Sequence, residues 1–593
     1  MDAVKTLAAA LAPLCGIDEP TLMDWIEVPK NTEMGDYAFP CFRLSKTLRK
    51  APPAIAAELK EKLSLPAGFT KCEAVGGYLN FFTDKGAVAN AVLSRVLSEG
   101  DAYGTSTEGN GKTVCVEYSS INIAKPFGFH HLPSTAIGNA LYRIYKALGY
   151  HTVGINHLGD WGTQFGKMIT AYKLWGTKPV DDYSIRELVA LYVRFHDEAD
   201  KDPSLNDAAR AWFHKIEQGD PEALSLWEKM KDATIREVKV TYKRMGVDFD
   251  SWNGEAFYTN KMQPIIDELK EKGISKLDQG AQIVDLSEWN MPPCIIVKSD
   301  GSTIYATRDL AAACYRKETY DFSKLLYVVA YQQDLHFKQF FKVLELMGRD
   351  WAKDCVHVNF GMVSMEGGAF HTREGKVLYL DDVLDAAVEK TYDIICEKSP
   401  DLEDKRSAAE AVGVGAILWS VLYNSRIKDV TFSWDKVLNF DGETAPYVQY
   451  THARSCSVLR KAGEKPASFD ASLLNDPEST ALLKAIAAFP EAVQAAAEKY
   501  EPYVVARAIM QIANAFNRFY YEQRIMADDA AVRAARLALT DATRQTLKNG
   551  LNLLGILAPE RMYYAGYQAR PVEPGPRQRE HQKEISGREA SFS

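Results

Sequence analysis

Residues 117–141 combine side chains and glycines that are suited to binding phosphate groups. His130 and His131 are adjacent, and both imidazoles can donate hydrogen bonds to phosphate oxygens. Lys125 adds a mobile positive charge, and Gly128 lets the backbone approach a ligand closely. These residues predict an anion site. A surface loop with incidental histidines is the alternative, because short motifs have a real false-positive rate.

The surrounding pattern indicates how these residues are positioned. Residues 113–118 (T-V-C-V-E-Y) are a β-branched run typical of a buried strand. Apolar residues then recur at helical spacing at Leu132, Ile137, Leu141 and Ile144. A strand that enters a helix through a glycine-containing loop points free backbone N–H groups at a ligand. Strands and amphipathic helices alternate over residues 112–170 and again over 293–386, which predicts a parallel α/β sheet.

The loop S-S-I-N-I-A-K-P-F-G-F-H-H-L-P-S-T resembles the first signature of the arginyl-tRNA synthetases, a family of class I aminoacyl-tRNA synthetases. Four later segments resemble the same family in the same order. They are N-H-L-G-D-W-G-T-Q-F-G-K (156–167), S-D-G-S-T-I-Y-A-T-R-D-L (299–310), Q-D-L-H-F-K-Q (333–339) and D-G-E-T-A-P-Y-V-Q-Y-T-H-A-R (441–454). Five long motifs in register are far more specific than one short pattern.

The resemblance implies an α/β fold with a class I synthetase Rossmann-like parallel-sheet catalytic domain. We expect this domain at 111–390, with a helical insertion at about 172–288. An N-terminal α+β additional domain that contacts the tRNA elbow would occupy 1–110. A stem-contact region and an all-α anticodon-binding bundle would occupy 391–562. Residues 563–593 contain few apolar side chains, so we expect this tail to be disordered.

The family activity would be that of an arginine–tRNA ligase. Such an enzyme activates L-arginine with ATP to arginyl-adenylate and transfers it to the 3′ end of arginine tRNA, releasing AMP and pyrophosphate. Because no covalent enzyme intermediate is needed, catalysis must come from positioning and from donors aimed at the phosphates. Lys125, His130 and His131 are the expected catalytic residues. Mg²⁺ is the expected cofactor, with no dedicated protein ligands.

Carried over by position, the resemblance also implies binding residues. For arginine they are Glu117, Ser120, Asn122, His131, Tyr305, Asp309 and Gln333, with Asp309 on the guanidinium. For ATP they are Gly128, Gly159, Asp160, Gly162, His336 and Arg373. For tRNA they are Asn80, Phe82, Tyr447, Gln449, Tyr450 and Arg454. Structural roles stay open for Tyr305, Glu117, Gln333 and about half of the tRNA set, since half-buried elements place alternate residues inside.

The first signature departs from the family pattern H-x-G-H. Here the four positions are Gly128, Phe129, His130 and His131, so the first histidine is missing and His130 replaces the glycine on which adenine packs. We expect His130 to supply the lost donor, with Gly128 allowing the close approach. A paralogue that binds tRNA without activating arginine is the alternative, and a generic nucleotidyl-transferring α/β enzyme is a third.

Composition restricts the class of protein. The chain has 593 residues, a net charge of −9 and nine cysteines without a C-x-x-C pair. We therefore expect neither a disulfide framework nor a zinc site, and reduced, mostly buried thiols. No apolar run approaches the ~20 residues of a membrane span. The sequence predicts a cytoplasmic enzyme without a membrane partner, and the family implies a monomer.

Overall fold

The computed structural model describes residues 3–29, 34–123, 125–366, 378–440, 442–463, 466 and 468–562. Arg373 and the tail at 563–593 lie outside these residues. The chain divides into two compact units. Unit 1 comprises Met1–Tyr103, Ser455–Ala487 and Asn514–Gln545, and unit 2 comprises Gly104–Arg454, Ala488–Ala513 and Thr546–Ser593.

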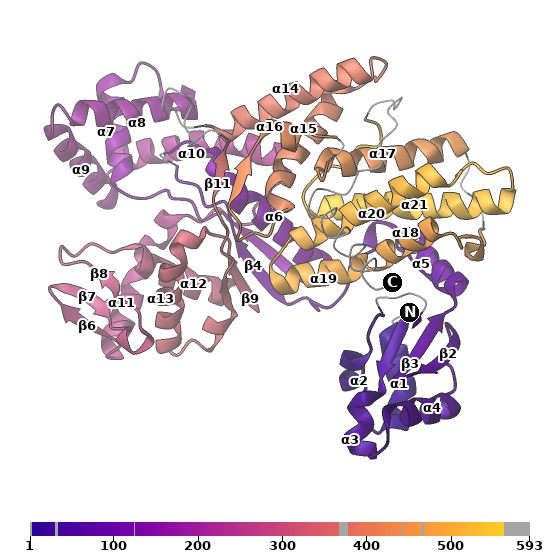
Figure 1. Cartoon of the computed structure of the whole chain (residues 1–593). Coiled ribbons are helices and arrows are strands. Elements are labelled where there is room, and N and C mark those ends of the chain that lie inside the picture. The colour runs from indigo at the N-terminus through magenta and orange to yellow at the C-terminus, as the bar shows by residue number, and fades with distance from the viewer. Residues whose placement is uncertain are drawn as a thin grey trace, which may run out of the picture. The chain divides into compact units, whose positions relative to one another are not determined.

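Unit 1 contains an antiparallel sheet of three strands in the order β1-β3-β2. Its core is formed where apolar helix faces meet the sheet: Leu7 and Leu11 pack with Phe39 and Phe81. Figure 1 shows these strands beside their helices. The elements are α1 (Ala3–Cys15), α2 (Glu19–Trp25), β1 (Tyr37–Pro40), α3 (Ser45–Leu48), α4 (Pro52–Lys62), β2 (Phe69–Val75), β3 (Tyr78–Thr83) and α5 (Lys85–Glu99).

Unit 1 also includes segments from the C-terminal part of the chain. Helix α18 (Pro477–Ala487) contacts α5. The Tyr103 hydroxyl donates to the Ile486 carbonyl at 2.8 Å, and Gln545 Nε2 donates to Asp101 Oδ1 at 2.7 Å. Unit 1 therefore contains residues that are far apart in the sequence, since Tyr103 and Ile486 are separated by 383 residues.

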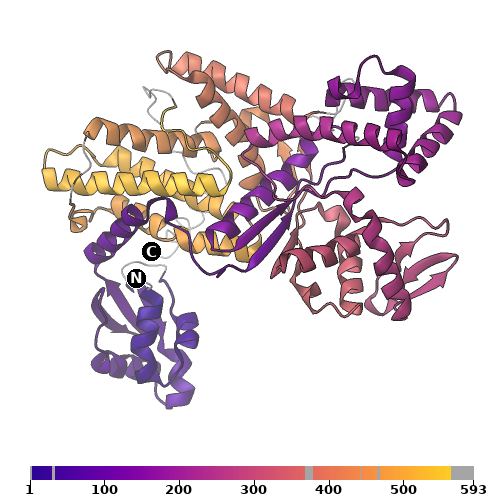
Figure 2. The same cartoon turned by 180° about the vertical axis from the view of Figure 1, so that it is seen from behind.

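Unit 2 is built on a sheet of four parallel strands in the order β10-β9-β4-β5, seen from behind in Figure 2. They are β4 (Thr113–Glu117), β5 (His151–Ile155), β9 (Lys324–Tyr327) and β10 (Cys355–His357). Glu117 pairs with Ile155 on one side and with Tyr327 on the other. The predicted strand, parallel sheet and α/β class are confirmed. Because the strands are parallel, their carboxyl ends share one edge.

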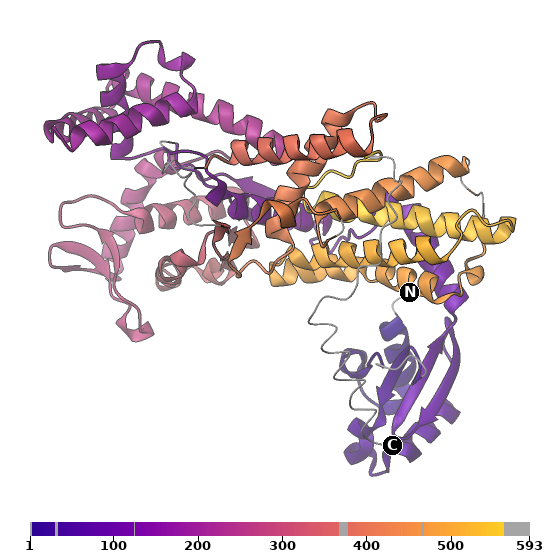
Figure 3. The same ribbon diagram turned by 45° about the horizontal axis from the view of Figure 1, so that its top comes forward.

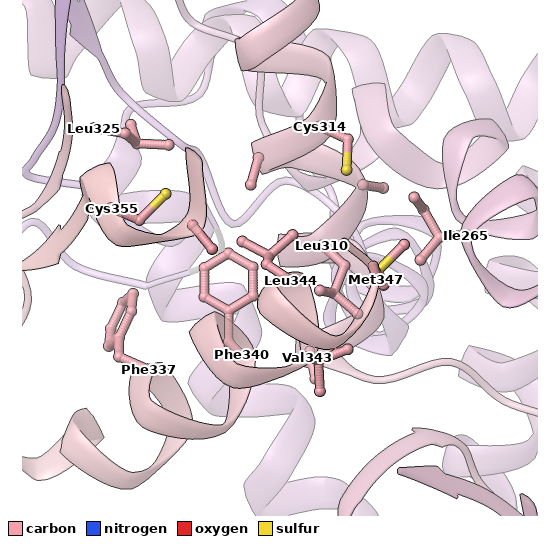
Figure 4. Packing of buried hydrophobic residues seen from close by; sticks show 14 of the residues in the cluster. Ile265, Leu310, Cys314, Leu325, Phe337, Phe340, Val343, Leu344, Met347 and Cys355 are labelled. Carbon is pink, nitrogen blue, oxygen red and sulfur yellow. The ribbon is translucent and has the colours of Figure 1, made fainter. Parts of the chain in front are cut away.

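Helix α6 (Leu132–Ala147) follows β4, and α11 (Met262–Glu271), α12 (Tyr305–Tyr320) and α13 (Asp334–Leu346) supply much of the core. In Figure 4, Leu310 and Cys314 of α12 meet Phe340 and Leu344 of α13. The described cysteines are all free, and seven of the nine are buried, as the composition predicts. No helix in the described part of the chain is sufficiently long and apolar to span a membrane.

Four helices follow β5: α7 (Thr163–Trp175), α8 (Ile185–Ala199), α9 (Ser204–Glu217) and α10 (Pro221–Arg244). Figure 3 shows them as a group. Helix α8 begins with a capping box in which the Ser184 N–H donates to Glu187 Oε2 at 2.8 Å. This interaction satisfies backbone groups that the helix leaves unpaired.

An antiparallel sheet, β6-β7-β8, follows α10 and α11. Its strands are Ser275–Asp278, Ala281–Val284 and Cys294–Val297, so β6 and β7 lie in an interval that the sequence pattern indicates to be helix-rich. Gln279 and Gly280 join the first two strands, with φ of 48° and 83°. Two successive positive φ values are what a tight two-residue hairpin requires.

The remaining elements are mostly helices, as the sequence predicts. They are β11 (Val363–Met365), α14 (Leu380–Lys398), α15 (Lys405–Leu422), β12 (Val430–Phe432), α16 (Trp434–Val437), α17 (Ala445–Ala462), α19 (Phe489–Lys499), α20 (Tyr503–Glu522) and α21 (Ala530–Leu553). Helices α14 and α15 pack closely because Gly413 brings its backbone against Ala387 and Val388.

Close packing of α6 on β4 depends on Gly138. A Cβ atom there would lie 2.1 Å from Tyr118 Cβ, at the base of a buried side chain. We expect Gly138→Ala to destabilise the protein by ~1–3 kcal/mol through overpacking. Thermal unfolding would measure the loss. Gly442→Ala is the control, because its Cβ would meet nothing closer than 3.4 Å. Equal midpoints for the two variants would contradict the expectation.

Candidate functional site

The carboxyl end of β4 leads into a strained loop. Ser119 and Ser120 have φ of 66° and 45°, which is left-handed backbone that residues with a Cβ adopt at a cost of ~1–2 kcal/mol each. The Ser119 N–H donates to Ser134 Oγ at 2.9 Å, which anchors the loop to α6. Ser120 Oγ is buried and has no hydrogen-bond partner among the described residues. The loop therefore presents a polar atom that a ligand could satisfy.

The histidine loop is held by backbone pairing with residues 378–380. The Phe129 N–H donates to the Leu378 carbonyl at 2.9 Å, and the Leu380 N–H donates to the Phe127 carbonyl at 3.0 Å. Gly128 and Tyr379 form an antiparallel bridge between them. The segment immediately before Leu378 includes Arg373, an expected ATP residue that lies outside the described residues.

The rings of His130 and His131 are in contact, with centroids 4.0 Å apart and planes tilted by 39°. Burial and the neighbouring His130 lower the pKa of His131 to about 3. Desolvation and the charge of Lys125 also lower the pKa of His130. Both imidazoles are therefore neutral at pH 7. His131 Nδ1 lies 3.3 Å from the Gly128 carbonyl, which can only accept, so this tautomer leaves His131 Nε2 as an acceptor.

The structure explains why glycine precedes this histidine pair. A Cβ atom at position 128 would lie 2.7 Å from both Nδ1 and Cε1 of His130. The His130 imidazole thus occupies the space beside residue 128 that a side chain would fill. Gly128 and His130 are a matched pair, because a side chain at 128 would require the imidazole to move.

Asp309 and His336 are brought together by adjacent helices. Asp309 lies one turn into α12, His336 lies near the start of α13, and His336 Nε2 is 2.7 Å from Asp309 Oδ2. Burial alone would lower the pKa of His336, but the hydrogen bond and negative charge of Asp309 raise it. Tyr305 begins α12 one turn before Asp309 and is 70% exposed, so it is not a core residue.

A second acid, Glu255, faces the same region. Burial raises the pKa of Glu255 to about 7; Arg308, 3.5 Å away, opposes this rise, while the charges of Asp160 and Asp309 add to it. Asp160 is itself buried, with a raised pKa, and accepts a hydrogen bond from the Ala256 N–H at 2.9 Å. The sheet edge therefore concentrates carboxyl groups, which a cationic ligand would stabilise in their charged form.

Glu117, expected to hold the amino group of arginine, is paired within the protein. Its Oε2 lies 2.5 Å from Arg316 Nη1, and the Arg316 side chain is 1% exposed. Burial disfavours the charged guanidinium, but the Glu117 carboxylate outweighs it and raises the pKa of Arg316. His157 Nδ1 lies 3.3 Å from Arg316 Nη2. The pair joins β4 to α12.

The remaining expected residues lie around this edge. The loop of Asn122 bridges to Gly159, and a Cβ at 159 would lie 2.1 Å from Asn122 Oδ1. Gly162 has φ of 129° and precedes α7, so its conformation favours glycine. Gln333 is exposed at the start of α13, and Lys125 is exposed in the histidine loop.

The candidate tRNA residues are mostly buried in this conformation. Gln449 is fully buried, and its Nε2 donates to the carbonyls of Ala411 and Leu557 at 2.9 and 2.8 Å. Tyr447, Tyr450 and Asn80 are less than 9% exposed, while Phe82 and Arg454 are partly exposed. Arg454 Nη2 donates to the Tyr450 hydroxyl at 3.0 Å. Burial indicates structural roles for Gln449, Tyr447, Tyr450 and Asn80, so we carry forward only Phe82 and Arg454 as RNA contacts.

Sequence reasoning overlooked Glu255, Arg308 and Arg316. A signal exists for Arg316, which follows Asp309 by seven residues on an alanine-rich helix and therefore lies on the same face. Glu255 follows W-N-G in a loop and has no comparable signal. Its burial depends on packing against α12, which no local pattern shows.

The arrangement of acidic, histidine and cysteine side chains bears on the expected Mg²⁺. Among the residues that the structure describes, no group of three or more His, Cys, Asp or Glu side chains is arranged to hold an ion. The described residues therefore do not form a protein cage for Mg²⁺. Mg²⁺ commonly binds through substrate phosphates instead.

Three family models together match most of the chain. The model for the catalytic domain of class I tRNA synthetases of the arginine type matches residues 92–434. The arginyl-tRNA synthetase N-terminal domain matches 2–83, and the DALR anticodon-binding domain matches 448–562.

Individual relatives agree with these models. Arginine–tRNA ligase of Alkaliphilus metalliredigens is 54% identical over 92% of this chain and 97% of its own. That of Clostridioides difficile is 54% identical over 91% of this chain and 95% of its own. The Thermus thermophilus arginyl-tRNA synthetase structure has a TM-score of 0.77 and 26% identity, covering 94% and 99% of the two chains. The fold, the order of its signature loops and these matches together mean that the chain belongs to the arginyl-tRNA synthetase family.

Proposed function

We propose that the chain is an arginine–tRNA ligase whose arginine pocket lies at the carboxyl edge of β4, β5 and β9. The observation that carries this proposal is the cluster of Asp309, Glu255 and Asp160 at that edge. A guanidinium is a planar cation with five N–H donors, so it needs several oxygen acceptors around it. An anionic or neutral substrate would gain nothing from this arrangement.

His336, expected to contact ATP, is better placed to orient Asp309. It holds one carboxylate oxygen at 2.7 Å and leaves the other available to the guanidinium. Tyr305, exposed on the same face one turn earlier, can pack against the planar group. This assignment makes His336 a positioning residue, while Asp309 and Glu255 make the contacts with the substrate.

The opposite end of arginine would lie at the β4 loop. Ser120 and Asn122 present polar atoms there, and the acceptor His131 Nε2 suits the α-ammonium. The arginine carboxylate attacks the α-phosphorus of ATP, and the bond from that phosphorus to the β-phosphate oxygen breaks to release pyrophosphate. We assign the donation of a hydrogen bond to the phosphates to His130 and Lys125, with Arg373 as a further candidate beyond the described residues.

Mg²⁺ would arrive on the ATP phosphates. We propose cytoplasmic translation as the setting, with arginine tRNA as the partner and the monomer as the working form. The predicted boundaries (1–110, 111–390 with an insertion at about 172–288, and 391–562) remain part of this proposal, as do RNA contacts by the partly exposed Phe82 and Arg454.

The primary test is arginine-dependent exchange of pyrophosphate into ATP, with and without arginine tRNA, and with lysine and citrulline as controls. Exchange that requires arginine supports the ligase. Tight tRNA binding without exchange would overturn it and favour the alternative, a paralogue that binds tRNA without activating arginine. Exchange with an unrelated small acid would favour a generic nucleotidyl transferase.

Removing the charge of Asp309 tests the guanidinium assignment. We expect Asp309→Asn to lower kcat/KM for arginine by roughly 100-fold or more, because a charged hydrogen bond to the substrate is lost. Pyrophosphate exchange measures the loss. Asp321→Asn, at the C-cap that follows the same helix, is the control, since Asp321 is exposed and its φ of 41° suits asparagine. Equal activity of both variants would contradict the assignment.

The altered signature makes a separate prediction. His130→Ala should lower kcat for exchange roughly 100-fold, as loss of a donor to developing charge does. The double change Gly128→His with His130→Gly should retain activity within a few-fold, because it exchanges the positions of imidazole and glycine. His214→Ala, at an exposed helix position, is the control. An active His130→Ala enzyme would show that another group supplies the donor.

The raised pKa of Glu255 predicts pH-dependent arginine binding. Arginine binds the ionised carboxylate, so binding should release a proton and strengthen as the pH rises from 6 to 8. Deprotonation of His336 beside Asp309 also strengthens arginine binding as the pH rises. Calorimetry at both pH values would measure this change, and Glu255→Gln should reduce it. An unchanged pH dependence in Glu255→Gln would assign it to other groups.

A further inference from the structure

A chain of buried hydroxyl groups connects the insertion to the histidine loop. The Tyr242 hydroxyl, from the last turn of α10, lies 2.7 Å from Ser119 Oγ. Ser119 Oγ lies 2.8 Å from Thr135 Oγ1, which is 2.8 Å from the His131 carbonyl oxygen. At the other end, Asn156 Nδ2 donates to the Tyr242 hydroxyl at 3.1 Å.

Each contact in this chain joins two buried polar groups. Thr135 Oγ1 has a single proton, which it donates either to Ser119 Oγ or to the His131 carbonyl, both 2.8 Å away. One hydrogen bond joins the hydroxyls of Ser119 and Tyr242, and either hydroxyl can be its donor. The amide of Asn156 donates to Tyr242. Removal of one member therefore deprives its neighbours of a hydrogen-bond partner.

Tyr242 is held firmly in position. Its ring is buried and lies 5.2 Å from Phe127 and 5.1 Å from Phe249. The preceding residue, Thr241, donates to the Asp381 carboxylate of α14 at 2.8 Å. Helix α14 begins at Leu380, whose N–H donates to the Phe127 carbonyl. Helix α10 is thus tied to the same loop by two separate routes.

The hydroxyl chain ends on the part of the site that carries strain. Left-handed backbone at Ser119 and Ser120 persists only when its surroundings specify it. Ser119 is fixed at its N–H by Ser134 and at its Oγ by Tyr242. The next residues, Ser120 and Asn122, are proposed arginine ligands. The position of the amino-acid end of the pocket therefore depends on a side chain of the insertion.

We propose that Tyr242 is a positioning residue that uses its hydroxyl to hold the Ser119–Ser120 loop in its arginine-binding conformation. This inference rests on the proposed arginine site. The insertion is then part of the activation machinery, because it determines how arginine is held although it does not touch the substrate. The ring of Tyr242 serves packing, whereas its oxygen serves the site.

Tyr242→Phe separates these two roles, since it keeps the ring and removes the hydroxyl. We expect KM for arginine in pyrophosphate exchange to rise about 3- to 10-fold, the effect of one net hydrogen bond. KM for ATP should change less than about twofold. Tyr145→Phe is the matched control, because Tyr145 is equally buried and donates to a backbone carbonyl, that of Ala497, at 2.9 Å. The two variants should melt at similar temperatures.

Ser119→Ala breaks the same chain at its second member and should give the same change in KM. The double variant Tyr242→Phe, Ser119→Ala should bind arginine no more weakly than either single variant. The hydrogen bond between Tyr242 and Ser119 is already lost in each single variant, so the second change removes nothing further from it. If Tyr242→Phe does not yield folded protein, Ser119→Ala carries the same expectation.

The outcomes separate this inference from the underlying function. An unaltered chain without arginine-dependent exchange would overturn the proposed ligase itself. An active unaltered chain whose Tyr242→Phe variant keeps a normal KM for arginine would overturn only the positioning role. Additive effects in the double variant, or equal increases in KM for ATP and arginine, would also overturn it, since they would indicate general destabilisation.

Discussion

The buried ion pair of Glu117 and Arg316 is the interaction on which the catalytic half of the structure depends. Glu117 ends the strand at the middle of the parallel sheet, and Arg316 lies on the helix that carries Asp309. A buried carboxylate without a partner would be strongly disfavoured, so the pair fixes α12 against β4. The guanidinium end and the amino end of the proposed pocket acquire a defined separation for this reason.

The carboxyl groups at this edge of the sheet are only partly neutralised by basic side chains of the protein. Arg308 partly compensates Glu255, and His336 partly compensates Asp309. Burial, together with the charges of Asp160 and Asp309, outweighs Arg308 and raises the pKa of Glu255. If arginine binds as proposed, this site would distinguish a guanidinium from a neutral isostere, since citrulline would leave the carboxylates without a cationic partner.

Much of the fold could be predicted from the sequence because local patterns report local structure. The strand before the histidine loop, the capping box at Ser184 and the helical C-terminal segments are all recognisable from residue type and spacing. The β6–β7 hairpin was less visible, since its turn is the uncommon pair Gln279–Gly280. Association of α18 with α5 depends on contacts across almost 400 residues, which no window of sequence contains.

The candidate site likewise contains residues that local motifs identify and residues that only long-range contacts identify. Asp309 and His131 belong to long motifs, whereas the roles proposed for Glu255 and Tyr242 depend on burial beside segments that are distant in the chain. The combination of Gly128 and His130 is explained only by the structure, in which the His130 imidazole occupies the space beside residue 128.

The hydroxyl chain from α10 also has a consequence for synthesis of the protein. Ser119 is made early, but its partner Tyr242 follows 123 residues later, and His336 and Leu380 later still. A chain growing from its N-terminus therefore carries an unfinished pocket until α13 and α14 have emerged. Because such long-range contacts form slowly, the proposed arginine pocket would be completed late in the folding of unit 2.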